Sequence, residues 1–232
     1  MCMGCKIVNR QPMEICYLDS PRDESTPLPN NSKYRQAIGS LLYLTTVSRP
    51  GIAVAVGLLS RRVEAPRECD WKAVKRIMRY MAATIDKRLR LSGDDEVILN
   101  CFVDADWAGD KTDRKSTTGY VVRLGKCALA WSSQKQSAVA LSFTEAEYIA
   151  ASQTCREILW LRRLLDDTGI PQREAAIIYE DNQGCIRVAE TDRCSARTKH
   201  IDLRCHLLPN LRDQRIINLE YCPSEDMIVD IQ

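Results

Sequence analysis

Residues 97–104 read Val-Ile-Leu-Asn-Cys-Phe-Val-Asp, an extended-type run that ends in a carboxylate. Because β-branched and aromatic side chains favour strands, we expect a strand at Val97–Val103 that Asp104 closes. Upstream, from Tyr34 on, the sequence is rich in Ala, Leu and Val with helical spacing. The pattern changes after Gly93, which predicts that a sheet-containing domain begins near this residue.

On both sides of this run, hydrophobic periodicity and turn residues predict the other elements. Gly125-Lys126 is a short hairpin signal, and Gly169 and Pro171 end a long helix. The expected strands are 119–124, 127–131, a short one at 137–141, 175–179 and 216–221, and the expected helices are 67–83, 144–167, one from about 183, 201–213 and a final turn. We therefore expect an α/β fold with the order β-β-β-α-β-α-α-β. We divide the chain into a poorly defined segment and linker (1–31), a helical segment (32–92) and the sheet domain (93–232).

The two parts of the chain differ in charge. Residues 1–92 hold 16 Lys and Arg against 8 Asp and Glu, whereas residues 93–232 hold 17 against 23. A basic part joined to an acidic part is typical of a protein that binds a polyanion and holds cations, although chance variation in solvated faces would look the same. In the 67–83 helix we expect Trp71, Val74, Ile77, Met78 and Met81 to be buried. The same helix carries a basic stripe, a solvated face or a phosphate track, at Lys72, Lys75, Arg76 and Arg79.

Composition favours an intracellular protein, in the cytoplasm or nucleus. Eleven scattered cysteines form one CxxC, Cys2 and Cys5, without a second pair at zinc spacing, which favours reduced thiols. No apolar run approaches the roughly 20 residues of a membrane span. The N-terminus lacks a secretory signal pattern, so we expect neither secretion nor a membrane partner.

Three acidic residues stand at positions where function concentrates. Asp104 and Asp181 follow expected strands, and adjacent strands ending in carboxylates would place two negative groups close together, which costs energy unless a proton or a divalent cation relieves the repulsion. Glu147 begins an apolar stripe on the long helix, whereas Glu145 is turned about 200° away. Taken singly, such acids are more often caps or dipole partners, but together they point to a metal site.

Several blocks of sequence resemble the ribonuclease H region of copia-type long-terminal-repeat retrotransposon Pol polyproteins. The blocks are 104–110 (Asp-Ala-Asp-Trp-Ala-Gly-Asp), 114–120 (Arg-Lys-Ser-Thr-Thr-Gly-Tyr), 140–150 (Ala-Leu-Ser-Phe-Thr-Glu-Ala-Glu-Tyr-Ile-Ala), 181–183 (Asp-Asn-Gln) and 197–202 (Arg-Thr-Lys-His-Ile-Asp). Residues 34–44 and 71–80 resemble the segment that joins the reverse transcriptase to that domain. The resemblance implies a ribonuclease H-like mixed sheet flanked by helices, preceded by a helical connection segment.

The resemblance also implies a function and its residues. It implies hydrolysis of the RNA strand of an RNA–DNA hybrid with two Mg²⁺ ions, or Mn²⁺ in their place, and a reverse transcriptase domain as a partner in the parent polyprotein. The implied catalytic and metal-binding residues are Asp104, Glu147, Asp181 and Asp230. The candidate nucleic-acid contacts are Lys111, Arg114, Lys115, Thr117, Lys135, Gln136, Ser142, Asn182 and Gln183.

Departures from the family pattern leave alternatives open. Gly51 stands where the family usually has aspartate, and the chain ends two residues after Asp230, which shortens the helix expected to carry that aspartate. The polymerase aspartates of reverse transcriptase are missing, so this chain is not itself a polymerase. The alternatives are an inactive or domesticated transposon fragment that binds nucleic acid without cleavage, and a structural part of a larger Pol assembly. His200 and His206 are expected to pack structurally, and contact with nucleic acid is the alternative for both.

Overall fold

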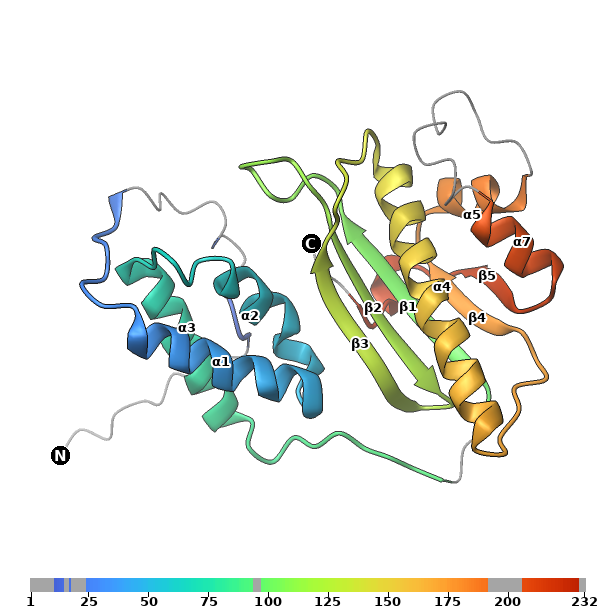
Figure 1. The fold of residues 1–232 in the computed structure, drawn as a ribbon, viewed down its shortest axis with the longest axis horizontal. Coiled ribbons are helices and arrows are strands. Elements are labelled where there is room, and N and C mark those ends of the chain that lie inside the picture. Colours follow the sequence, from blue (N-terminus) through green and yellow to red (C-terminus); the bar gives the residue numbers. More distant parts are fainter. Residues whose placement is uncertain (1–10, 15–16, 18–23, 94–96, 192–205, 230–232) are drawn as a thin grey trace. The chain divides into compact units, whose positions relative to one another are not determined.

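The computed structural model describes residues 11–14, 17, 24–93, 97–191 and 206–229 (Figure 1). It divides the chain into two compact units, Met1–Leu89 and Arg90–Gln232. The described residues contain no helix that is both long and apolar enough to cross a membrane.

The first unit is helical. Its elements are α1 (Ser32–Val47), the 3₁₀ helix η3 (Pro50–Ile52), α2 (Ala53–Ser60) and α3 (Glu68–Ala83). The turn between α1 and α2 falls at Arg49-Pro50-Gly51, where proline begins η3 because its fixed φ suits a first helical turn. Apolar residues of all three α-helices form one core, which includes Tyr34, Ile38, Leu59 and Ile77.

The α3 helix confirms the helix expected at 67–83. Its start is capped from within the first turn, where Asp70 Oδ2 accepts from the backbone N–H of Arg67 over 2.8 Å. Val74 and Ile77 are fully buried, and Trp71 and Met81 are partly buried against the same core. Met78 is predicted to be buried, but 40% of it is exposed. The apolar residues of α3 cover a wider face of the helix than its neighbours do, so only the centre of that face is fully buried.

The second unit is built on a five-stranded mixed sheet. The strands are β1 (Leu99–Asp106), β2 (Thr117–Leu124), β3 (Cys127–Lys135), β4 (Ala176–Glu180) and β5 (Ile217–Tyr221), in the spatial order β3-β2-β1-β4-β5. The first three strands form antiparallel hairpins, whereas β4 is parallel to both β1 and β5. The helices are α4 (Phe143–Asp167), α5 (Gln183–Glu190) and α7 (Leu207–Asp213), followed by the 3₁₀ turn η5 (Ser224–Asp226).

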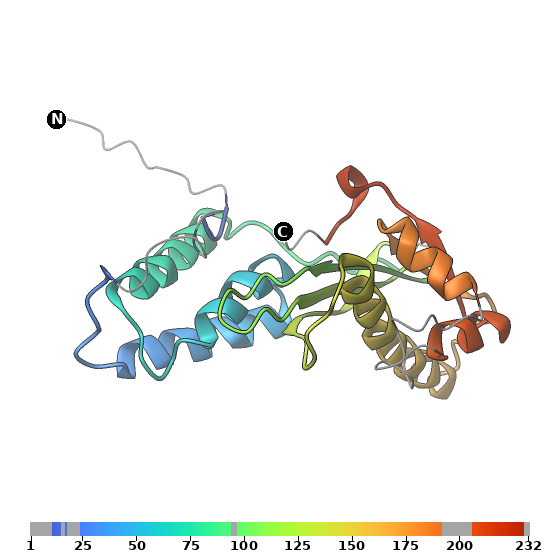
Figure 2. The same cartoon turned by 90° about the horizontal axis from the view of Figure 1, so that it is seen from above.

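The helices pack on one face of this sheet. Figures 1 and 2 show α4 lying across β1 and its neighbours. The buried residues of α4, α5 and α7 share one hydrophobic cluster with Leu99, Cys101 and Val103, which alternate along β1. A smaller cluster on the opposite side joins Phe102, stacked on Tyr179, to Cys222 and Val229 near the described end of the chain.

The expected α/β fold is confirmed, with two local corrections. Residues 137–141 form no strand and lead directly into α4. β1 extends to Asp106, so Asp104 lies inside the strand and does not close it, because antiparallel pairing with β2 continues as far as Thr117. The helix expected at 201–213 is seen as α7, and residues 201–205 lie outside the described residues.

Candidate metal centre and nucleic-acid interface

The sheet register explains why two of the predicted acids meet. Phe102 pairs with Tyr179 in the parallel β1–β4 ladder. Continuing this register by two residues places Asp181 level with Asp104. Parallel strands present their carboxyl ends at the same edge, so both carboxylates lie at one end of the sheet.

Glu147 joins them from α4. Asp104, Glu147 and Asp181 each offer a carboxylate oxygen, and these three oxygens lie within 4.8 Å of one another. Glu147 is fully buried and Asp104 is 4% exposed, whereas Asp181 is half-buried and opens the group towards solvent. The structure therefore brings together three of the four predicted ligands, and Asp230 lies outside the described residues.

Glu147 lacks the partners that a buried carboxylate needs. Neither of its oxygens has a partner with normal hydrogen-bond geometry among the described residues. Burial, followed by the charges of Glu180, Asp104 and Asp181, raises the pKa of Glu147 well above its usual range, and the nearby backbone N–H of Ala105 opposes this effect only weakly. A cation at this point would reverse that preference, because it stabilises the charged carboxylate.

A hydrogen bond holds the third acid. Ser224 in η5 donates its hydroxyl to Asp181 Oδ2 over 2.7 Å, while Oδ1 of Asp181 is buried without a hydrogen-bond partner among the described residues. The donor set is thus made only of carboxylate oxygens, with no nitrogen or sulfur. Oxygen-only sets of this kind suit Mg²⁺ and Mn²⁺, so the residues present fit such an ion.

Glu180 is an acid that the sequence analysis did not single out. It is fully buried, and its Oε1 accepts from the backbone N–H of Asn182 over 3.1 Å, while Oε2 has no described partner. Burial raises the pKa of Glu180, and the charges of Asp181 and Asp104 act in the same direction. The period-2 pattern of β4 was the available signal, because Ala176, Ile178 and Glu180 share the buried face.

Comparison with known proteins places the chain in a family. It is 44% identical over 186 residues to the retrovirus-related Pol polyprotein from transposon TNT 1-94 of Nicotiana tabacum, which covers 80% of this chain. It is 37% identical over 205 residues to that from transposon RE2 of Arabidopsis thaliana, which covers 88%. Over most of its length the chain is homologous to a segment of copia-type retrotransposon Pol polyproteins. It spans about 14% of the length of these two relatives.

Solved structures give a weaker likeness, and a scan against models of known protein families finds no match. LC11-RNase H1, solved in complex with an RNA/DNA hybrid, is 12% identical with a TM-score of 0.40, and the match covers 56% of this chain and 88% of that one. This Pol segment has a ribonuclease H-like fold, as its strand order, strand register and flanking helices show.

The structure divides the predicted nucleic-acid contacts of the Pol segment into exposed and buried residues. Lys111, Arg114 and Gln183 are exposed and Lys115 is half-buried. Gln136 is 2% exposed and donates to Thr118 Oγ1 and to the Ala146 carbonyl, so its side chain bridges β2 to α4. Such burial does not fit a direct contact with nucleic acid, and the same holds for Thr117, at 4% exposure.

Three further candidates have structural partners. Lys135 lies between Asp110 and Asp113, at 2.5 Å and 2.8 Å, so its charge is largely neutralised. Ser142 accepts from the backbone N–H of Glu145 and caps α4, and Asn182 accepts from that of Cys185 and caps α5. Such polar residues are favoured at helix N-termini because they satisfy donors that the helix leaves unpaired.

The structure describes one of the two histidines. His206 is exposed and precedes α7 as its N-cap residue, without a side-chain capping bond. His200 lies outside the described residues. Among the described residues, the acids Asp104, Glu147 and Asp181 form the one group with the arrangement of a metal site.

Proposed function

We propose that this chain is a retrotransposon-derived ribonuclease H that hydrolyses the RNA strand of RNA–DNA hybrids with two divalent cations, Mg²⁺ or Mn²⁺. The observation that carries the proposal is the convergence of three carboxylates from β1, α4 and the end of β4 within 4.8 Å. Glu147 supports the proposal further. It is fully buried and has no hydrogen-bond partner among the described residues, which is costly unless a cation or proton compensates the carboxyl.

Asp104, Glu147 and Asp181 would hold the ions, and Asp230 stays a proposed fourth ligand on the basis of the family motif. Bound divalent ions supply Lewis acidity, which makes water a better nucleophile and stabilises the leaving oxygen of the scissile phosphate. The protein's own part is to position these ions. The hydrogen bond from Ser224 fixes the Asp181 carboxylate, and packing of α4 on β1 fixes Glu147 against Asp104.

The substrate follows from the fold and from the surface. A hybrid exposes a wide minor groove with 2′-hydroxyls, which distinguish the RNA strand. Lys111, Arg114, Lys115 and Gln183 are the predicted contacts that keep exposed or half-buried positions. The three cations would hold phosphates, and the neutral amide of Gln183 would add a hydrogen bond. In the parent polyprotein, the reverse transcriptase would supply this hybrid.

Cleavage of a labelled RNA–DNA hybrid by the full chain tests this function. With Mg²⁺, Asp104→Asn, Glu147→Gln and Asp181→Asn should each lower the rate roughly 100-fold or more, because each removes a charge that holds the ions. Glu145→Gln is the matched control, because Glu145 is also buried on α4 but accepts from the backbone N–H of Leu141 over 2.9 Å, a bond that glutamine can keep.

The same assay decides between cleavage and binding. Equal cleavage by wild type and Asp104→Asn, or no cleavage of any hybrid by wild type, would reject the nuclease. Hybrid binding that persists without cleavage would instead support the inactive, nucleic-acid-binding fragment. Activity with Mn²⁺ but not with Mg²⁺ would indicate an incomplete ligand set, since Mg²⁺ demands the more regular geometry.

A further inference from the structure

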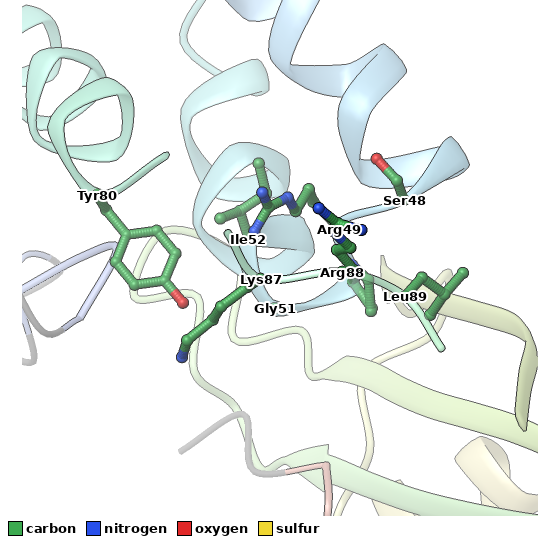
Figure 3. A pocket seen from close by; sticks show the side chains of 9 residues that line it. Ser48, Arg49, Gly51, Ile52, Tyr80, Lys87, Arg88 and Leu89 are labelled. Atoms are coloured by element: carbon green, nitrogen blue, oxygen red, sulfur yellow. The ribbon is translucent and has the colours of Figure 1, made fainter. Parts of the chain in front are cut away.

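The helical unit contains a cavity of about 200 Å³ that the ribonuclease site does not use. It lies between the Arg49-Pro50-Gly51 turn after α1, Tyr80 on α3 and the segment Lys87–Leu89 (Figure 3). The backbone N–H of Lys87 donates to the Thr84 carbonyl over 3.0 Å, so the chain turns after α3 and brings this segment to the cavity. Two separate turns thus build one concave site.

The lining of this cavity is positively charged. Arg49, Lys87 and Arg88 line it, and none of the nine lining residues is acidic. None of these three side chains makes an ion pair or hydrogen bond with another described residue, in contrast to Arg76, which binds Glu14 over 2.7 Å. Three cations that share a cavity repel one another, and an anion between them would relieve the repulsion.

The remaining lining suits a phosphate ester. Leu89 and Pro50 supply apolar surface for carbon atoms, and the Tyr80 hydroxyl is a neutral donor. The planar guanidinium groups of Arg49 and Arg88 match phosphate oxygens, and the Lys87 ammonium adds a point charge. A volume of about 200 Å³ corresponds to roughly six or seven water molecules, which is room for a phosphate with its ester carbons.

We propose that Arg49, Lys87 and Arg88 bind a backbone phosphate of a nucleic acid in this cavity, so that the helical unit contacts the substrate independently of the metal centre. A polyanion is favoured over a single small anion by the excess of Lys and Arg over Asp and Glu in residues 1–92, 16 against 8. Lys72 and Arg79 on α3 are exposed cations of the same unit. The choice of an RNA–DNA hybrid as ligand rests on the proposed function.

Gly51 offers a matched pair of variants. A Cβ at this residue would meet no atom within 4 Å, so a side chain can be added without a clash. Gly51→Asp puts a negative charge at the cavity, and Gly51→Asn adds a side chain of the same shape without charge. Comparing the two therefore isolates electrostatics from packing.

Hybrid binding is measured by fluorescence anisotropy with the full chain, in EDTA so that no cleavage occurs, over a series of salt concentrations. Gly51→Asp should weaken binding about fivefold to tenfold relative to Gly51→Asn, and should lower the slope of log K against log salt by about one. Arg49→Gln and Arg88→Gln should each weaken binding about threefold or more. Arg35→Gln, an exposed cation on α1 outside the cavity, is the control and should leave binding nearly unchanged.

Equal hybrid affinity of Gly51→Asp and Gly51→Asn would overturn the proposal. Stabilisation of the wild type by inorganic phosphate, together with that equality, would show that the cavity takes free phosphate and would also overturn it. Circular dichroism identifies any variant that fails to fold. If Arg49→Gln or Arg88→Gln fails to fold, the comparison of Gly51→Asp with Gly51→Asn still tests the proposal. A charge-dependent loss of hybrid binding in a protein that cleaves nothing would uphold this site while rejecting the nuclease.

Discussion

Glu147 and Glu180 are two buried carboxyl groups that face the same small volume. Burial raises the pKa of both groups, and the charge of Glu180 raises the pKa of Glu147 further. Glu147 is one of the three acids whose carboxylate oxygens lie within 4.8 Å of one another, whereas Glu180 is not part of this group. Glu180 therefore adds negative charge beside the site without completing it.

Replacing Glu180 by glutamine should stabilise the protein without metal. The glutamine side chain would keep an oxygen to accept from the backbone N–H of Asn182, but the change would remove a buried charge. At pH 8 in EDTA, we expect Glu180→Gln to raise the free energy of unfolding by roughly 1–3 kcal/mol, measured by urea denaturation. Glu190→Gln, an exposed change at the end of α5, is the control. A loss of stability in Glu180→Gln would contradict the assigned repulsion.

The same two groups predict how stability depends on pH. Their folded-state pKa values are raised above the unfolded value of about 4.3, so the folded protein binds more protons than the unfolded chain above that pH. The stabilisation is fully present below about pH 4.3 and is lost as pH rises through the raised values. In EDTA, the free energy of unfolding should fall by up to about 1.4 kcal/mol per pH unit for each proton released.

Mg²⁺ should flatten this pH dependence, because it compensates the charged form of Glu147. Urea denaturation between pH 6 and pH 9, with EDTA and with Mg²⁺, provides the measurement. If the free energy of unfolding instead rises with pH in EDTA, the pKa values of these two carboxyl groups are not raised in the folded protein.

At the scale of elements, the N-termini of α4 and α5 approach each other beside the site. Gly184 lets them approach, because a Cβ there would meet Asn182 Oδ1 and Thr144 Oγ1, each at 2.9 Å. The Asn182 cap follows Asp181 directly, so the start of α5 and the third carboxylate are positioned together. Ser142 plays the corresponding role for α4, five residues before Glu147.

Removing the α5 cap should affect both stability and cleavage. Asn182→Ala should lower the free energy of unfolding by about 1 kcal/mol, because it leaves a backbone donor of the first turn unsatisfied. Asn182→Ser should restore stability, since serine also caps helices, and Gln183→Ala should change stability little. Cleavage assays separate the roles of Asn182. Recovery of the rate in Asn182→Ser would indicate positioning through the cap, whereas a rate that stays low would indicate a direct contact with nucleic acid.

At the scale of the whole molecule, two units each have their own hydrophobic core. Domains with separate cores are able to fold as separate units. Calorimetry of the full chain should therefore show two transitions, and Mg²⁺ should raise the midpoint of only one of them. A fragment of residues 90–232 should keep the Mg²⁺-sensitive transition. A single transition that shifts as a whole with Mg²⁺ would show that the units unfold together.

The order of the elements and most of the helical and extended segments could be predicted from the sequence, although the strand expected at 137–141 does not form. The sequence also predicted the three acids that the structure brings together. These features depend on local periodicity, as in α3, and on motifs that read continuously along the chain, as around Asp104, Glu147 and Asp181. Helical geometry fixes which residues of α4 share a face, and it already separated Glu145 from Glu147, the one that joins the three-acid group.

Which side chains are buried, and what they contact, depends on how distant elements pack together. Gln136 and Lys135 look like surface residues in the sequence, yet one bridges β2 to α4 and the other pairs with two aspartates. The cavity between Arg49 and Lys87–Arg88 joins residues almost forty positions apart in the sequence, and burial of Glu180 depends on the cover that the helices provide. Such contacts form between elements distant in the chain, where local patterns carry no signal of which side chains will meet.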